Sequence, residues 1–292
     1  MVGYILALLS SLFFSLYIIP RKLSKLSPII FSFFMSFGFF VSTVVLYGFQ
    51  PLIKFQETPT PVLFWSIGAG FIWAIAFVLF VSSIDFIGLS RSNQWKNLQG
   101  PVGVILSLFI LGETVTINPV YALLAALSVF LSAVFFTTSS DKKKKILLKG
   151  VLFATIAAIG FGTVAVIQKY VTVHVGVYIQ QVVWSASIAL SLLFYILLSK
   201  RFKEVLTASK KDIVLGLGAG IVYLGASCCQ LFSYKYLAAS IGFTIIQMNA
   251  FWTITIGILV FKEINLKKYY KNVILGFIFT LIGIVFLVFA RR

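Results

Sequence analysis

VGYILALLSSLFFSLYII, residues Val2 to Ile19, is the stretch of sequence that decides the class of this fold, because it contains no charged residue. A helix that crosses the hydrocarbon layer of a bilayer needs about 20 largely apolar residues. The run has no basic segment before it and no small-residue cleavage site after it, unlike a secretory signal peptide. We therefore expect it to be retained as a first membrane-spanning helix.

Similar apolar runs continue along the chain, and charged residues, Pro and Gly separate them. Of the 292 residues, 60% are hydrophobic and 11% are charged, which would leave a soluble domain with too little polar surface. The sequence predicts an all-α polytopic membrane protein with ten transmembrane helices and short loops. The predicted spans cover residues 2–20, 27–49, 62–83, 87–111, 118–138, 147–168, 175–198, 212–232, 238–261 and 271–290.

Lys and Arg lie mainly in the loops, and their distribution predicts the orientation in the membrane. The loops after spans one, five, seven and nine hold 17 of the 24 basic residues, and the opposite side holds five. Because cytoplasmic loops are enriched in Lys and Arg, both termini are predicted to lie outside the cytoplasm of a plasma-membrane protein. The net charge of +17 forms no basic stripe with interleaved aromatic residues, so nucleic acid is not an expected partner.

Three landmarks in the first half recur 150 residues later. The matching pairs are Gly68-Ala69-Gly70 with Gly218-Ala219-Gly220, Ser90 with Ser240, and Phe109-Ile110-Leu111-Gly112-Glu113 with Leu259-Val260-Phe261-Lys262-Glu263. Residues 1–140 and 147–292 are therefore predicted to be two five-helix repeats of one transmembrane domain. Because five is odd, the second repeat is inverted, an arrangement that places a substrate site near the midplane and permits alternating access.

Polar residues inside the apolar runs are the best pointers to a site, because unpaired polar groups are costly in lipid. The fourth span contains RSNQWKNLQGP, residues 91–101. At about 100° per residue, Asn93, Lys96 and Asn97 share one helix face, and Trp95 and Gln99 share another. In the ninth span, Gln247 and Asn249 align with Asn97 and Gln99 through the repeat. A shared cavity is predicted, and the alternative is that these amides only join helices.

Further candidates lie in other spans. Gln180, Gln181 and Trp184 in the seventh span could line the same cavity, and Trp73 and Tyr223 are repeat-related aromatic residues that could form its walls.

The most specific of these hypotheses concerns the role of Lys96. We expect it to face a water-filled cavity, where it would donate hydrogen bonds to substrate and act as the mid-membrane proton carrier of any proton-coupled uptake. The alternative is a side chain that extends along its stem to the membrane interface.

Several kinds of chemistry have no support in the sequence. His174 is the only histidine, and Cys228 and Cys229 are adjacent in an apolar run, where they are expected to pack against other helices. The sequence therefore shows no Ser-His-Asp set, no paired catalytic carboxylates and no metal-ligand spacing. Neither a metal, a cofactor nor an enzymatic activity is therefore expected.

Two five-helix halves, each with a Glu at the end of its fourth helix, resemble the drug/metabolite transporter superfamily. The stretch from Gly70 to Glu113, with Ile87-Gly88-Leu89-Ser90-Arg91 and Leu111-Gly112-Glu113, is similar to the glucose/ribose porter branch of bacterial sugar-uptake proteins.

The resemblance implies a carrier of a small polar solute, with a sugar as the first candidate, and amides with a stacking aromatic ring suit a sugar. An anionic or amphipathic metabolite is the alternative, because Lys96 would pair with a carboxylate or phosphate. A channel or a structural membrane protein is the alternative from a different functional class. The coupling ion and the oligomeric state are open.

Overall fold

The computed structural model describes residues 1–47, 60–87, 89–137, 148–259 and 266–290, and these contain helices and no strand. The helices of the first half are α1 (Val2–Leu16), α2 (Ile19–Leu23), α3 (Pro28–Tyr47), α5 (Thr60–Ile87), α6 (Leu89–Lys96), α7 (Gln99–Ile110), η2 (Glu113–Val115) and α8 (Pro119–Thr137). Those of the second half are α9 (Leu148–Val175), α10 (Val177–Leu198), α11 (Phe202–Leu206), α12 (Lys210–Ser233), α13 (Ala239–Ile246), α14 (Asn249–Leu259) and α15 (Leu266–Ala290).

Seven helical segments in the described part of the chain are long and apolar enough to cross a membrane. They are Val2–Arg21, Pro28–Tyr47, Pro61–Ile87, Leu148–Val175, Val177–Leu198, Lys210–Ser233 and Lys268–Ala290. An all-helical protein with several membrane spans is thereby confirmed.

Each of the other three predicted spans is either interrupted or too short to count as a single long apolar helix. The fourth is divided into α6 and α7 at Asn97–Leu98, and the ninth into α13 and α14 at Gln247–Met248. The apolar stretch of α8, Pro119–Phe135, is short. The count of ten stays a prediction.

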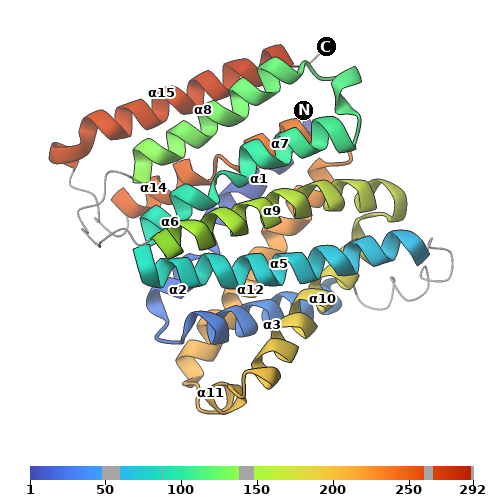
Figure 1. Cartoon of the computed structure of the whole chain (residues 1–292), viewed down its shortest axis with the longest axis vertical. Coiled ribbons are helices and arrows are strands. Elements are labelled where there is room, and N and C mark those ends of the chain that lie inside the picture. The colour runs from blue at the N-terminus through green and yellow to red at the C-terminus, as the bar shows by residue number, and fades with distance from the viewer. Residues whose placement is uncertain (48–59, 88, 138–147, 260–265, 291–292) are drawn as a thin grey trace.

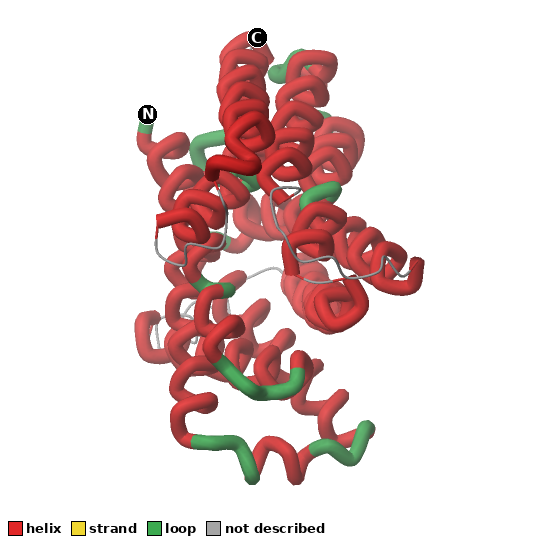
Figure 2. Tube along the Cα trace, turned by 90° about the vertical axis from the view of Figure 1, so that its left-hand side faces the viewer, coloured by secondary structure: helices red, strands yellow, loops and turns green. Residues whose placement is uncertain are grey.

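Most of the helices lie roughly side by side in a bundle. The bundle is longest in the direction perpendicular to these helices, which is vertical in both views (Figure 1, Figure 2). One end of the bundle is the pair α8 and α15, which pack closely along their lengths. Toward the other end, α3 packs on α10 and α12, and α5 packs on α9 and α10. The divided helices and α1 lie between these two ends. The start of α1 and the end of α15 lie on the same side of the bundle in Figure 1.

Glycine allows α3 and α12 to meet backbone to backbone. A Cβ added at Gly38 would lie 2.5 Å from the Leu217 carbonyl oxygen, and one at Gly220 would lie 2.7 Å from the Gly38 carbonyl carbon. A Cβ added at Gly218, two residues earlier on α12, would meet nothing within 4 Å. Small residues at crossing points are how membrane helices reach close van der Waals contact. Gly38 and Gly220 therefore fix the position of α12 against α3.

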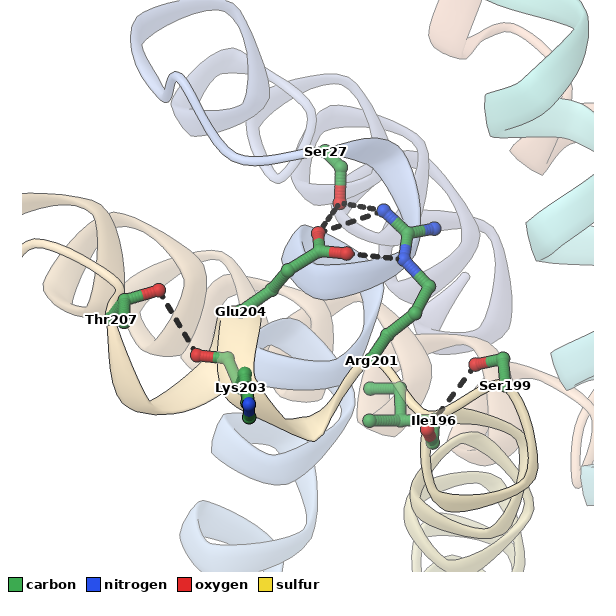
Figure 3. Close-up of polar contacts among 7 residues, drawn as sticks. All are labelled: Ser27, Ile196, Ser199, Arg201, Lys203, Glu204 and Thr207. Carbon is green, nitrogen blue, oxygen red and sulfur yellow. Dashed lines mark hydrogen bonds and ion pairs between the residues drawn. The ribbon is translucent and has the colours of Figure 1, made fainter.

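The short helix α11 is attached to the start of α3 by a polar cluster outside the membrane spans (Figure 3). Arg201 binds the Glu204 carboxylate through Nε at 2.6 Å and Nη2 at 2.8 Å. The Ser27 hydroxyl donates to Glu204 Oε2 at 3.2 Å and accepts from Arg201 Nη2 at 3.1 Å. The hydrogen bonds from the Arg201 guanidinium lower the pKa of Glu204, so this small contribution to stability is present above pH 4.5 and is lost as the pH falls through the lowered pKa.

Gly220→Ala is expected to destabilise the protein by about 1–3 kcal/mol, because the new methyl group must push α12 away from α3. Gly218→Ala is the matched control and should be neutral or slightly stabilising, since Ala is the better helix former and the space is open. Thermal unfolding of the purified proteins in detergent measures both. Equal melting temperatures for the two variants would contradict the close α3–α12 contact.

Candidate functional site

A pocket at the centre of the bundle has a cavity volume of about 60 Å³. Helices of both halves contribute to it, including α6 and α7 from the first half and α13 and α14 from the second. Its lining consists of Phe14, Tyr17, Trp73, Lys96, Gln99, Phe161, Val164, Ala165, Gln168, Trp184, Tyr223, Gln230, Phe243, Ile246, Gln247 and Asn249. We call this space the central pocket.

Aromatic rings form one wall of the central pocket. The Tyr223 ring lies at the middle of the wall, with its centroid 5.2 Å from Tyr17, 5.3 Å from Trp73 and 6.1 Å from Trp184. Phe161 packs edge-to-face on Trp73 at 5.9 Å. All of these rings except Phe161 are at least nine-tenths buried, so the wall is part of the hydrophobic core as well as a surface. Such rings offer flat apolar faces against which a solute can stack.

Amides form a second wall and connect the two halves of the chain. Gln99 Nε2 donates to Gln247 Oε1 at 2.7 Å, which joins the start of α7 to the break between α13 and α14. Gln230 Nε2 donates to Gln168 Oε1 at 3.1 Å and to the Tyr234 hydroxyl at 2.9 Å. The amides are therefore held in place by one another before any solute binds.

Hydrogen-bond donors without acceptors remain in the central pocket. Within the described chain, Gln168 Nε2 and Trp184 Nε1 have no hydrogen-bond partner, although both side chains are buried. The Lys96 ammonium lies 5.2 Å from the Phe80 ring centroid, a cation–π contact, and no carboxylate of the described residues lies within ion-pair distance of it. Buried donors normally find acceptors, so these two nitrogens depart from the usual pattern among the residues that line the pocket.

Seven of the residues that the sequence singled out line the central pocket. They are Trp73, Lys96, Gln99, Trp184, Tyr223, Gln247 and Asn249. Lys96 is thus one of the lining residues, and its role toward a solute stays a prediction.

Asn93, Trp95, Asn97, Gln180 and Gln181 are not among the lining residues. Gln180 instead accepts from Thr172 and donates to the Gln168 carbonyl at 3.0 Å, and Gln181 donates to Ser227. These two amides join helices, which is the alternative the sequence left open.

Asn97 is buried without a side-chain hydrogen bond in the described structure, and Gln99 occupies the place predicted for it opposite Gln247. The reason is the helix break. Helical periodicity was extended from Asn93 through Gln99, but the chain changes direction at Asn97–Leu98 and the shared face ends there.

Sequence reasoning missed several lining residues, including Phe14, Tyr17, Phe161 and Gln168. Gln168 carried a usable signal, because it is a lone amide within an apolar span. The aromatic residues carried none, since the sequence has 31 Phe and 12 Tyr residues and nothing in their spacing marks these three.

A buried carboxylate positions the helix that leads into this site. Glu113 accepts from the Ala239 amide at 2.5 Å, from the Ser240 amide at 3.0 Å and from the Ser240 hydroxyl at 2.7 Å, and so caps the N-terminus of α13. Lys169 binds the preceding turn by donating to the carbonyls of Tyr234 and Leu237, the latter at 2.9 Å. Glu263, the counterpart of Glu113 in the repeat, lies outside the described residues.

The described residues hold no group of three or more His, Cys, Asp or Glu side chains that could bind a metal ion. The chemistry of the site is thus that of amides, aromatic rings and one ammonium group.

Comparisons with known proteins agree with this picture in its coarser features. Residues 148–289 match the model of the EamA-like transporter family, which suggests a membrane transporter of small solutes. A solved structure titled "Crystal structure of protein" is similar to this chain with a TM-score of 0.71 at 14% sequence identity, over 97% of this chain and 96% of that one. The likeness therefore concerns the fold. No curated protein matches the chain.

Glu113→Ala is expected to lower the free energy of unfolding by about 1–3 kcal/mol, because it leaves buried amide groups of α13 without an acceptor. Glu113→Gln keeps one acceptor oxygen and should lose less. Thermal unfolding in detergent is the measurement, and Glu204→Ala, which removes an exposed carboxylate, is the control with an expected loss below about 1 kcal/mol. A Glu113→Ala shift no larger than that of Glu204→Ala would refute the cap.

Proposed function

We propose that this protein is a secondary carrier that moves a small polar solute across the membrane by alternating access around the central pocket. The observation that carries the proposal is the central pocket itself, where Lys96 and several amides of both halves converge inside an otherwise apolar bundle. Polar groups at such a depth are costly unless they are used, and they are typical of substrate pathways. Helices broken at the midplane are the usual frame of such a site.

Helix boundaries support the inverted repeat on which alternating access rests. The segment α6 covers 89–96 and α13 covers 239–246, so both ends differ by 150 residues (239 − 89 = 246 − 96). The starts of α7 and α14, Gln99 and Asn249, differ by the same number. The helix pairs are related in the same way, since α5 packs on α9 as α12 packs on α1. A bundle of ten spans with both termini on one side accounts for these relations.

A sugar remains the first candidate for the solute. The amides of Gln99, Gln247 and Asn249 can exchange hydrogen bonds with hydroxyl groups, and the rings of Trp73 and Tyr223 offer stacking faces. The branch resemblance in residues 70–113 supports the same class.

The anionic metabolite is the second candidate, and the Lys96 environment favours it. An unpaired ammonium beside two donors without acceptors suits a solute that carries a carboxylate or phosphate. The same lysine is the group through which proton coupling would operate, because it is the lining residue that carries a basic side chain.

Uptake into proteoliposomes tests the carrier. We expect labelled hexose or hexuronate uptake that saturates and that unlabelled solute competes, whereas a channel would give unsaturable flux. Gln247→Leu should reduce uptake about tenfold or more, because it removes a pocket amide and leaves Gln99 unpaired. Phe109→Leu, at an exposed apolar position on α7, is the control and should transport normally. Unchanged uptake by Gln247→Leu would place the site elsewhere.

Lys96→Met completes this experiment, since it keeps the length of the stem and removes the charge. Loss of hexuronate uptake with hexose uptake retained would identify an anionic solute. Loss of the pH dependence alone would identify proton coupling. Wild-type uptake of both solutes at every pH would contradict any role for Lys96 in transport.

The proposed orientation, with both termini outside the cytoplasm, follows from the basic loops and is tested by cysteine labelling. In a variant without Cys228 and Cys229, Thr116→Cys should react with an impermeant thiol reagent in intact cells, and Lys203→Cys should react only after lysis. Thr116 and Lys203 are both exposed and lie in connections assigned to opposite sides. The reverse labelling pattern would invert the orientation.

A further inference from the structure

A second cavity lies between α1, α14 and α15 and has a volume of about 330 Å³. Its lining residues are Leu8, Met248, Phe251, Trp252, Phe277, Thr280, Leu281 and Ile284. We call this cavity the lateral groove, because the Leu8, Leu281 and Ile284 side chains are 41%, 62% and 40% exposed. It therefore opens on the outer surface of the bundle and not toward the central pocket.

The lateral groove offers hydrocarbon contacts and no free hydrogen-bonding group. Its two side chains with polar atoms are already engaged by the protein. The Thr280 hydroxyl donates to the Gly276 carbonyl at 2.9 Å and lies 2.7 Å from the Ser132 hydroxyl. Trp252 Nε1 donates to the Ser11 hydroxyl at 2.9 Å. An occupant that brought polar groups into the groove would leave them unsatisfied, which is costly away from water.

The helices around the groove determine what surrounds it. Val2–Arg21 and Lys268–Ala290 are both long and apolar enough to cross a membrane, and the groove lies about a third of the way along the first and near the middle of the second. Its opening therefore faces the hydrocarbon layer, where the abundant partner is a lipid acyl chain. The residues Phe277 to Ile284 extend for about 10 Å at 1.5 Å per residue, which gives a flexible chain a continuous apolar track.

The groove also touches the break in the ninth span. Met248 lies between α13 and α14 and lines the lateral groove, whereas its neighbours Gln247 and Asn249 line the central pocket. The Trp252–Ser11 hydrogen bond holds α14 against α1 beside this point. An occupant of the groove would therefore contact Met248, which lies between the two residues whose amides line the central pocket.

We propose that the lateral groove is a binding site for one acyl chain of a bilayer phospholipid, seated against Met248 at the break between α13 and α14. The apolar lining, the satisfied Thr280 and Trp252 and the position on two spans all point to this occupant. The inference holds whichever solute the central pocket carries.

Brominated phospholipid tests the site, because bromine quenches tryptophan fluorescence on contact and Trp252 lines the groove. The full-length protein is held in detergent micelles, and phosphatidylcholine brominated on its chains is added in increasing amounts, so that the lipid competes with detergent for the groove. The quenching that belongs to Trp252 is the difference between the wild type and Trp252→Phe. We expect this component to saturate at a low fraction of brominated lipid, as for a retained chain, and not to rise in proportion to it.

Two neighbouring positions on α15 provide a matched pair of variants. Ile284→Phe fills the groove and should raise the half-saturating fraction about tenfold or more, equivalent to about 1.4 kcal/mol. Val285→Phe adds the same ring at a 51% exposed position outside the groove and should behave as the wild type. Proportional quenching in the wild type, as in a general lipid annulus, or no Trp252 quenching at all, as when a second copy covers the groove, would overturn the proposal. The wild-type curve decides this even if Ile284→Phe does not fold.

Discussion

The fold depends on one constraint, that backbone amide and carbonyl groups inside a membrane must be satisfied by the protein itself. An interrupted helix conflicts with this constraint, and the two interruptions here resolve it in the same way. Bonds to the third preceding residue replace the regular pattern, from Leu98 to Trp95 at 3.2 Å and from Met248 to Ile245 at 3.0 Å. Each break is thus compatible with a buried position, and side chains beside it are turned toward the central pocket.

Aromatic packing makes one wall of the central pocket rigid, so the selection of a solute would depend on the polar residues of the pocket. The rings around Tyr223 contact one another from α1, α5 and α10 and belong to the larger hydrophobic core, so a solute meets a surface that is already formed. One amide pair, Gln99 with Gln247, connects the two halves. A solute that replaces this contact changes the connection between the halves, which is the kind of coupling that a carrier needs.

The sequence predicted the parts of this molecule that follow from composition and spacing. Apolar runs identified the long helices, and the 150-residue spacing placed Gln99 and Asn249 at equivalent starts of α7 and α14. Hydropathy does not reveal a break within an apolar run, so the division at Asn97–Leu98 was not predicted and Asn97 was assigned to the pocket together with Gln99. Tyr17 and Phe161 were missed for a different reason, because only tertiary packing distinguishes a wall residue from the many aromatic residues of the spans.

The glycine contact between α3 and α12 has a consequence for how the bundle can move. At Gly38 and Gly220 the two backbones touch without a side-chain layer between them, so neither helix can slide or roll past the other without a steric clash. Any change in the shape of the bundle must therefore move α3 and α12 together as one rigid body. The number of bodies that can move independently in this protein is therefore smaller than its number of helices.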